Sequence, residues 1–194
     1  IGQGLVAPLL QALALQADGW WLRSDIIWAK PAPMPESVTD RPTRSHEYVF
    51  LLTKSAKYFY DGNAVREPHA PETAGRFEYA FRSDRPKHYG AGFNISEAPV
   101  LNPAGRNKRS VWTIPTQAFH KAHFAVFPEK LVEPCVKAGC PAGGVVMDPF
   151  CGSGTTGLVA VRLGRSFIGI DASDEYRAMA LERMRAIQTQ MEMV

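Results

Sequence analysis

The most informative segment of the sequence is Val145-Val-Met-Asp-Pro-Phe-Cys-Gly-Ser-Gly-Thr-Thr156. It begins with a short apolar run that is ended by turn-forming residues, a pattern typical of a buried parallel strand. Gly152 and Gly154 have no Cβ, so they permit a tight turn and a close approach of the backbone to a ligand. We expect a helix to start near Thr155, and its free N–H groups and positive dipole end would attract an anionic group.

A second apolar run follows at residues 165–171 and ends in Asp171, which lies 23 residues after Asp148. An acid about 20 residues beyond a glycine-rich turn is placed to hold ribose hydroxyls. No Lys follows the last glycine, which argues against a phosphate loop of the ATPase kind, and the glycine spacing is a poor match to the NAD fingerprint. The residues alone predict an α/β ligand-binding unit, and a dinucleotide-binding oxidoreductase remains an alternative.

Composition sets broad limits on the function. With 194 residues and 45% hydrophobic residues, the chain is long enough for one domain with a sizeable core. The net charge of +3 permits a polyanionic partner without arguing for one. Three cysteines without ligand spacing disfavour a disulfide framework or a zinc site and favour a reducing cytoplasm, and no apolar run reaches membrane-spanning length.

The remaining elements are predicted from periodicity and turn residues. Helical spacing is expected over residues 1–19, 130–139 and 173–193, and residues 31–45 are rich in proline, which disfavours regular structure. Strands are expected at residues 20–30, at 47–54 and 57–61 joined by a short turn, and around Ser110-Val-Trp-Thr-Ile114. Residues 62–105 show no sustained period and predict an irregular insert.

Asp-Pro-Phe-x-Gly-Ser-Gly-Thr-Thr closely resembles the S-adenosylmethionine-binding motif of amino-group DNA methyltransferases, which methylate N4 of cytosine or N6 of adenine. The order of other matching segments is similar to that of the permuted class, in which the catalytic half precedes the cofactor half. These segments are Asp25-Ile-Ile-Trp-x-Lys-Pro31, His46-Glu-Tyr-x-Phe-Leu-Leu-Thr-Lys-Ser55, Lys57-Tyr-Phe-Tyr-Asp61 and His123-Phe-Ala-x-Phe-Pro128. The resemblance implies a Rossmann-like α/β methyltransferase, with a catalytic-half portion (1–61), a target-recognition insert (62–105) and a cofactor-binding half (106–194).

The resemblance also implies a set of residues that contact S-adenosylmethionine. We expect Asp148 to brace the loop and approach the methionine amino group, and Asp171 to bind the ribose hydroxyls. His123 is expected to have a packing and hydrogen-bonding role, and not to act as a general base. The implied cofactor-binding residues are Asp148, Phe150, Gly152, Ser153, Gly154, Thr155, Thr156, Asp171, Ala172, His123, Phe127 and Pro128.

One departure from the family pattern concerns catalysis. The tetrapeptide Asp/Ser/Asn-Pro-Pro-Tyr/Phe, which holds the target amine in the family, is absent from the 194 residues. We expect it upstream of Ile1, so no catalytic residue is predicted within this chain. The chain is therefore interpreted as the C-terminal two-thirds of such an enzyme, with a sheet short of central strands and no methylation activity in isolation. A non-catalytic DNA-binding fragment is a further alternative.

The implied partner is double-stranded DNA with a flipped target base, because an exocyclic amine inside a duplex is out of reach. A restriction-modification enzyme of a prokaryote or phage is expected, acting in the cytoplasm. The stretch Lys30-Pro-x-Pro-Met-Pro-Glu-Ser37 accompanies the Ser-Pro-Pro-Tyr form of the tetrapeptide in close relatives, which favours N4-cytosine over the alternative N6-adenine. The insert interleaves basic and aromatic residues, as nucleic-acid-binding segments do. Candidate DNA-binding residues are Lys30, Arg41, Arg44, Arg82, Arg85 and Lys87.

A C5-cytosine methyltransferase would instead need a cysteine nucleophile. Pro134-Cys135 superficially matches such a pair, but it lies in a helix-like run and lacks the Gln that usually follows. We therefore expect Cys135 to be a packed small hydrophobic residue.

Overall fold

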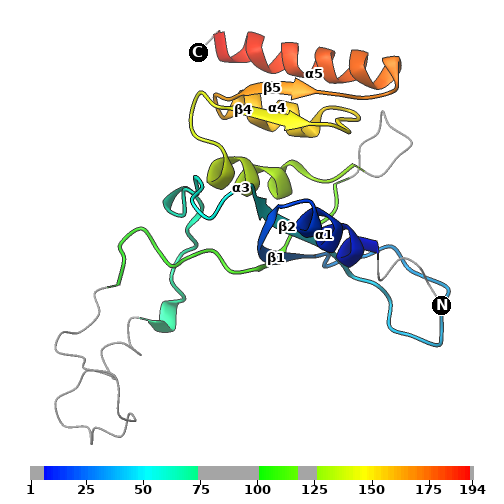
Figure 1. Cartoon of the computed structure of the whole chain (residues 1–194), viewed down its shortest axis with the longest axis vertical. Helices are drawn as coiled ribbons and strands as arrows, with labels where there is room; N and C mark the ends of the chain where they lie inside the picture. The colour runs from blue at the N-terminus through cyan, green and yellow to red at the C-terminus, as the bar shows by residue number, and fades with distance from the viewer. Residues whose placement is uncertain (1–6, 74–100, 118–125, 193–194) are drawn as a thin grey trace, which may run out of the picture.

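Two small sheets, with a helix between them, organise the molecule (Figure 1). The computed structural model describes residues 7–73, 101–117 and 126–192. In the first sheet, β1 (Trp21–Ala29) lies between β2 (His46–Thr53), which is antiparallel to it, and the short parallel strand β3 (Val111–Thr113). The strand expected around Ser110–Ile114 is thus confirmed.

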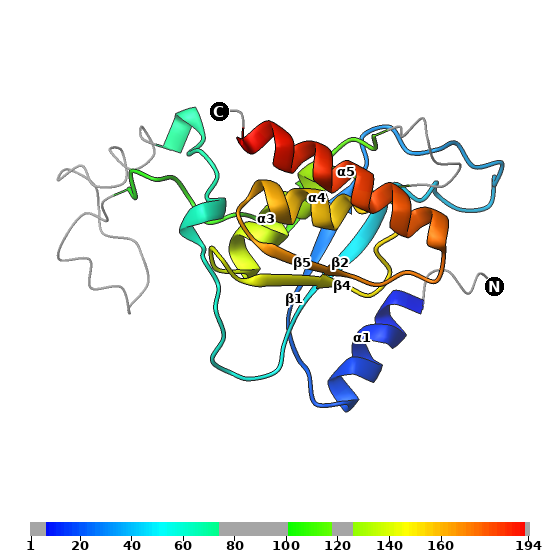
Figure 2. The same ribbon diagram turned by 90° about the horizontal axis from the view of Figure 1, so that it is seen from above.

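The second sheet contains the segment Val145–Thr156 with its glycine-rich turn. β4 (Val145–Asp148) pairs in parallel with β5 (Ser166–Gly169), and Asp148 lies opposite Gly169. The connecting helix α4 (Thr155–Arg162) and the long helix α5 (Asp174–Glu192) lie on the same face of this sheet (Figure 2). The α/β architecture and the Rossmann-like order of strand, glycine turn, helix, strand and helix are as the sequence predicts.

Helix α3 (Glu129–Gly139) joins the two sheets because two of its faces are apolar. Leu131 packs with Trp28 and Trp112 in the core of the first sheet. Val132 and Val136 lie on another face of the helix and pack against Val159 of α4 in the core of the second sheet. The relative position of the two sheets therefore depends on this one helix.

Local sequence explains where the helices begin and end. Helix α1 (Ala7–Ala17) stops at Gly19, whose φ of +86° allows Trp20 N–H to donate to Leu15 O at 3.0 Å. At the start of α5, the Ser173 hydroxyl accepts a hydrogen bond from Tyr176 N–H at 3.3 Å, as an N-cap residue does. Residues 1–6 of the expected first helix lie outside the described residues.

The strand predicted at residues 57–61 is wrong. Hydrogen bonds within residues 53–57 bend the chain, and the following backbone does not pair with β2. Asp61 N–H instead donates to Ala138 O of α3 at 2.9 Å, and the Asp61 carboxylate accepts from Asn63 and Ala64 N–H at the short helix η1 (Asn63–Val65). Pairing with α3 and capping of η1 therefore replace the expected strand ladder.

The expectation that β4 is a buried strand is also wrong within the described residues. Helices α4 and α5 cover one face, and the other face exposes Val145 (59%), Met147 (62%) and Ile168 (52%). The described parts of the chain contain no hydrogen-bonded pairing between the two sheets. The expectation of a sheet short of central strands stays a prediction.

The two ends of the insert are held together. Glu67 and Arg106 exchange backbone hydrogen bonds of 2.9 and 2.8 Å, and Arg66 donates to Gly105 O at 2.8 Å. Gly105 has a φ of +103°, and a Cβ there would lie 2.3 Å from Glu67 O, so only glycine fits. These contacts form a stem at residues 62–73 and 101–109, while residues 74–100 lie outside the described part.

Replacing Trp28 tests the core of the first sheet. Trp28 is 4% exposed, and its indole N–H donates to Ile114 O at 2.7 Å. We expect Trp28→Ala to lower the free energy of unfolding by about 3–5 kcal/mol in urea denaturation followed by circular dichroism. Trp21→Ala, on the same strand at 51% exposure, serves as the matched control and should cost about 0.5 kcal/mol. Equal effects of the two changes would contradict this core assignment.

Candidate functional site

The loop after β4, residues 149–154, is called the glycine loop below, and Asp148 braces its first half. One carboxylate oxygen of Asp148 accepts a hydrogen bond from Phe150 N–H at 3.0 Å. The other oxygen accepts one from the Thr156 hydroxyl of α4 at 2.6 Å. Asp148 thereby ties the strand, the loop and the first turn of the helix together, which is the bracing role expected of it.

Asp171 holds the second half of the glycine loop from the neighbouring strand. Its two carboxylate oxygens accept hydrogen bonds from Gly152 N–H at 2.8 Å and from Ser173 N–H at 2.9 Å. These two backbone donors lower the pKa of the Asp171 carboxyl below its usual value, so it is ionised at neutral pH. A carboxylate has about four acceptor positions, so Asp171 keeps capacity for hydroxyl donors of a ligand.

Gly152 and Gly154 are required for different reasons. Gly152 has a φ of +50°, and a Cβ there would meet nothing within 4 Å, so its requirement is conformational. Gly154 has a φ of +81°, and a Cβ there would lie 2.6 Å from the Cβ of Ala180 in α5. The loop therefore packs tightly against α5 at Gly154. At Gly152, which lies at the carboxyl end of the sheet, a Cβ would have no neighbour within 4 Å.

The first turn of α4 presents backbone donors. The helix ladder begins with Leu158 N–H bonded to Gly154 O at 2.9 Å, so the N–H groups of residues 155–157 precede it. The Thr156 hydroxyl is bonded to Asp148, and Thr155 is buried. Neither threonine caps the helix with its side chain, and the backbone N–H groups are the donors suited to an anionic ligand.

Sequence reasoning missed Arg183 of α5 and Glu129 of α3. The Arg183 guanidinium donates to Ser153 O at 2.7 Å and to the Ser153 hydroxyl at 3.1 Å, and it lies 3.9 Å from Glu129. Glu129 also pairs with Arg162 at 2.7 Å. A signal was present, because Arg183 follows Tyr176 and Ala180 at helical spacing on the packed face of α5, where a charge needs a partner.

The other residues predicted to bind the cofactor differ in their exposure and position. Phe150 is 87% exposed at the tip of the loop, and Ala172 is exposed directly after Asp171. Pro128 is buried at the N-cap of α3, and Phe127 beside it is exposed. His123 lies outside the described residues.

The basic residues of the proline-rich loop (residues 31–45) are partly neutralised. Lys30 pairs with Glu47 and lies 4.6 Å from the centre of the Trp28 ring, and Arg41 lies 2.7 Å from Glu36. The loop borders a cavity of about 550 Å³ that reaches α1 and the start of β2. It is lined by Pro8, Gln11, Lys30, Pro33, Met34, Pro35, Glu36, Arg44, His46, Glu47, Tyr48 and Phe50. Arg82, Arg85 and Lys87 lie outside the described residues.

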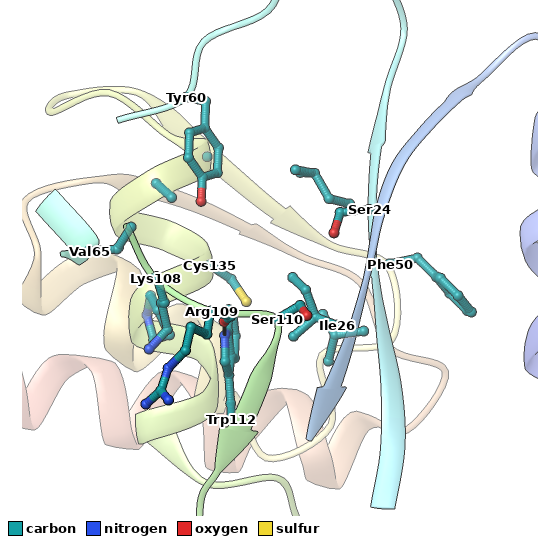
Figure 3. A pocket seen from close by; sticks show the side chains of 15 residues that line it. Ser24, Ile26, Phe50, Tyr60, Val65, Lys108, Arg109, Ser110, Trp112 and Cys135 are labelled. Carbon is teal, nitrogen blue, oxygen red and sulfur yellow. Dashed lines mark hydrogen bonds between the residues drawn. The ribbon is translucent and has the colours of Figure 1, made fainter. Parts of the chain in front are cut away.

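A second cavity, of about 240 Å³, lies between the first sheet and α3 and is mainly apolar (Figure 3). Cys135 of α3 points into it, and its thiol donates to Leu131 O at 3.3 Å. The surrounding protein raises the pKa of Cys135 to about 11, although the residue can be reached from the cavity. A thiol with so high a pKa is a poor nucleophile at neutral pH. The expectation that Cys135 is packed is wrong, because the residue is exposed at the wall of the cavity.

Two further findings concern the described residues alone. No cluster of three or more His, Cys, Asp or Glu side chains in them is arranged to hold a metal ion. None of the helices described is both long and apolar enough to cross a membrane.

Comparing two glycines tests the packing of the glycine loop. Gly154→Ala should lower the free energy of unfolding by about 2–4 kcal/mol. An alanine with a left-handed backbone conformation is strained, and its Cβ would also clash with Ala180. Gly164→Ala is the matched control: its φ is +72°, nothing lies within 4 Å of the added Cβ, and the cost should be about 1–2 kcal/mol. The measurement is thermal and urea unfolding, and an equal loss in both variants would contradict the close packing of the loop on α5.

Comparisons with known proteins agree with this geometry. Residues 3–182 match the family model N6_N4_Mtase, described as DNA methylase. The type II methyltransferase M.Cfr9I of Citrobacter freundii is 44% identical over 182 residues, which cover 94% of this chain and 50% of that protein. M.SmaI of Serratia marcescens is 44% identical over 177 residues, covering 91% of this chain and 51% of that protein. This chain thus spans about half the length of these relatives.

Solved structures show the same fold. The M1.HpyAVI–SAM complex aligns with a TM-score of 0.57 at 23% identity and covers 94% of this chain and 71% of that one. The PvuII DNA methyltransferase, described as cytosine-N4-specific, aligns with a TM-score of 0.62 at 21% identity and covers 93% of this chain and 60% of that one. The match of residues 3–182 to the family model favours the methyltransferase interpretation over the oxidoreductase alternative. This chain belongs to the N6 and N4 DNA methylase family.

Proposed function

We propose that this chain forms the S-adenosylmethionine-binding part of a DNA methyltransferase that modifies an exocyclic amino group, with N4 of cytosine as the favoured target. The observation that carries the proposal is the glycine loop held between Asp148 and Asp171 at the carboxyl ends of two parallel strands. Ligands of open α/β sheets bind at such ends.

The residues present fit this cofactor. The Asp171 carboxylate, ionised and not fully engaged, suits the two ribose hydroxyls. The N–H groups at the start of α4 suit the methionine carboxylate, and the exposed Phe150 and Ile170 offer apolar surface to the adenine. Gly152 has no side chain that would fill the space above the loop. When bound, the cofactor supplies a methyl group already activated by its sulfonium.

The target amine must also be positioned. Its lone pair is delocalised into the base, and in-line attack requires hydrogen-bond acceptors that hold the amine near the methyl group. No Pro-Pro-aromatic element occurs in the 194 residues. Pro31-Ala-Pro33 lacks adjacent prolines, and Asp148-Pro-Phe150 forms the glycine loop. We infer that polypeptide beyond these 194 residues supplies the element, in keeping with relatives of about twice the length.

DNA contact is proposed at two surfaces. The proline-rich loop lies on the same side of the molecule as the carboxyl end of β4, so the cavity beside it suits the target nucleotide (Figures 1 and 2). Tyr48 and Phe50, stacked 5.9 Å apart at this cavity, offer aromatic surface. The insert is the proposed target-recognition region. Its stem lies on the side of the molecule opposite to the proline-rich loop, where Asp61 N–H donates to Ala138 O near the end of α3 (Figure 1). Its contact with the duplex would therefore lie away from the flipped base.

The preference for N4-cytosine rests on the stretch Lys30-Pro-x-Pro-Met-Pro-Glu-Ser37 and is the finer part of the proposal. The structure of a cytosine-N4-specific enzyme shares the fold at 21% identity, which supports the architecture but leaves the base choice to experiment. N6-adenine is the alternative target.

Methyl transfer tests the proposal directly. The 194-residue chain, and a version extended at its N-terminus by the encoded upstream residues, are incubated with duplex DNA and S-adenosylmethionine carrying a labelled methyl group. Nucleosides are then separated and identified by mass. We expect the extended protein to produce labelled N4-methylcytosine and the 194-residue chain to produce none, because the base-positioning element is absent. N6-methyladenine would contradict the base preference, and methylation by the 194-residue chain would contradict the need for further polypeptide.

A further inference from the structure

The stem of the insert gathers three cations around one carboxylate. Glu67 accepts a hydrogen bond from Arg109 Nε at 3.0 Å, and Arg106 Nε and Lys108 Nζ lie 3.5 and 3.7 Å from its oxygens. Burial acts to raise the pKa of the Glu67 carboxyl, but the hydrogen bonds and charges of Arg109 and Lys108 lower it below its usual value. Glu67 is therefore ionised at neutral pH, and it holds the three cations together.

The backbone that carries these cations is fixed by the core, while the charges lie near the surface. The Trp112 indole N–H donates to Arg109 O at 2.6 Å, and Lys108 Nζ lies 4.9 Å from the centre of the Trp112 ring. The Arg109 side chain is 66% exposed. Figure 3 shows the Lys108 and Arg109 side chains pointing to the same side, away from the Cys135 sulfur. Because their backbone is already ordered, these cations lose little conformational entropy when they bind a ligand.

We propose that Arg106, Lys108 and Arg109 form a phosphate-binding cluster, through which the stem contacts the backbone of duplex DNA without reading its sequence. The inference rests on the proposed function, which makes DNA the partner. An exposed guanidinium pairs well with phosphate oxygens, and a lysine adds a point charge. The stem has four basic and two acidic side chains, so its local charge favours a polyanion. Contacts at the base of the insert would fix its orientation on the duplex.

A purely structural role of the cluster predicts something different. If the ion pairs only hold the stem closed, breaking them from either side would weaken DNA binding alike. If the cations bind phosphate, loss of a cation would weaken binding, but loss of the Glu67 charge would not, since that carboxylate competes with phosphate for the same cations. Substitutions of opposite sign therefore separate the two roles.

The experiment measures how tightly the N-terminally extended protein binds a labelled DNA duplex of arbitrary sequence, by fluorescence anisotropy at several salt concentrations. Thermal unfolding of each variant shows that it is folded. We expect Arg109→Gln to weaken binding on the order of fivefold in about 0.1 M salt, and to reduce the slope of log affinity against log salt by about one. The double variant Lys108→Gln/Arg109→Gln should reduce the slope by about two. Arg109→Lys keeps the charge and should restore the slope.

Two further variants complete the test. Arg185→Gln is the matched control, because it removes an exposed arginine of α5, away from the stem (Figure 1), and it should leave the slope unchanged. Glu67→Gln should bind DNA as tightly as the wild type or more tightly. An unchanged slope in the double variant, or equal weakening by Glu67→Gln and Arg109→Gln in folded protein, would overturn the inference and leave methyl transfer unaffected. If the wild-type protein neither binds duplex DNA nor transfers a methyl group to it, the proposed function itself fails.

Discussion

The site depends on two carboxylates that hold one loop from opposite sides. Asp148 binds the loop at Phe150 N–H and the helix at Thr156, and Asp171 binds it at Gly152 N–H. Each acid ends an apolar strand, and the parallel pairing of β4 with β5 brings the two ends together. Charge-assisted hydrogen bonds of this kind are roughly twice as strong as neutral ones. They fix a glycine-rich backbone that would otherwise lose much conformational entropy on ordering.

Helix α3 gives this site its relation to the rest of the molecule. Its Leu131 belongs to the core of the first sheet, and its Val132 and Val136 belong to that of the second. Glu129, at its first turn, reaches both Arg162 and Arg183 behind the glycine loop. One helix thus packs against both sheets and supplies the carboxylate that pairs with arginines behind the glycine loop. The apolar face of β4 and β5 that α4 and α5 leave uncovered is where a further layer of an α/β fold would pack.

Prediction from sequence succeeded where structure is local. The order of strand, loop and helix from Val145 to Arg162, and the acid at Asp171, follow from apolar runs, glycines and spacing within about 30 residues. It failed where partners are distant in the chain. The aromatic run at residues 57–61 has strand propensity, but Asp61 finds its partner in α3, 77 residues further on at Ala138. The helical spacing of α5 marks Arg183 as a charge on the packed face, but only tertiary packing shows that Ser153 and Glu129 are among its partners.

Calorimetric titration of S-adenosylmethionine into the wild-type chain, Asp171→Ala and Asp174→Ala tests whether Asp171 binds the cofactor. Asp174 is an acid three residues further on, exposed and paired with Arg177, so it controls for charge without touching the loop. We expect one binding site, with affinity weakened at least about fivefold in Asp171→Ala through the loss of charge-assisted hydrogen bonds and unchanged in Asp174→Ala. Equal affinity in folded wild type and Asp171→Ala would contradict it.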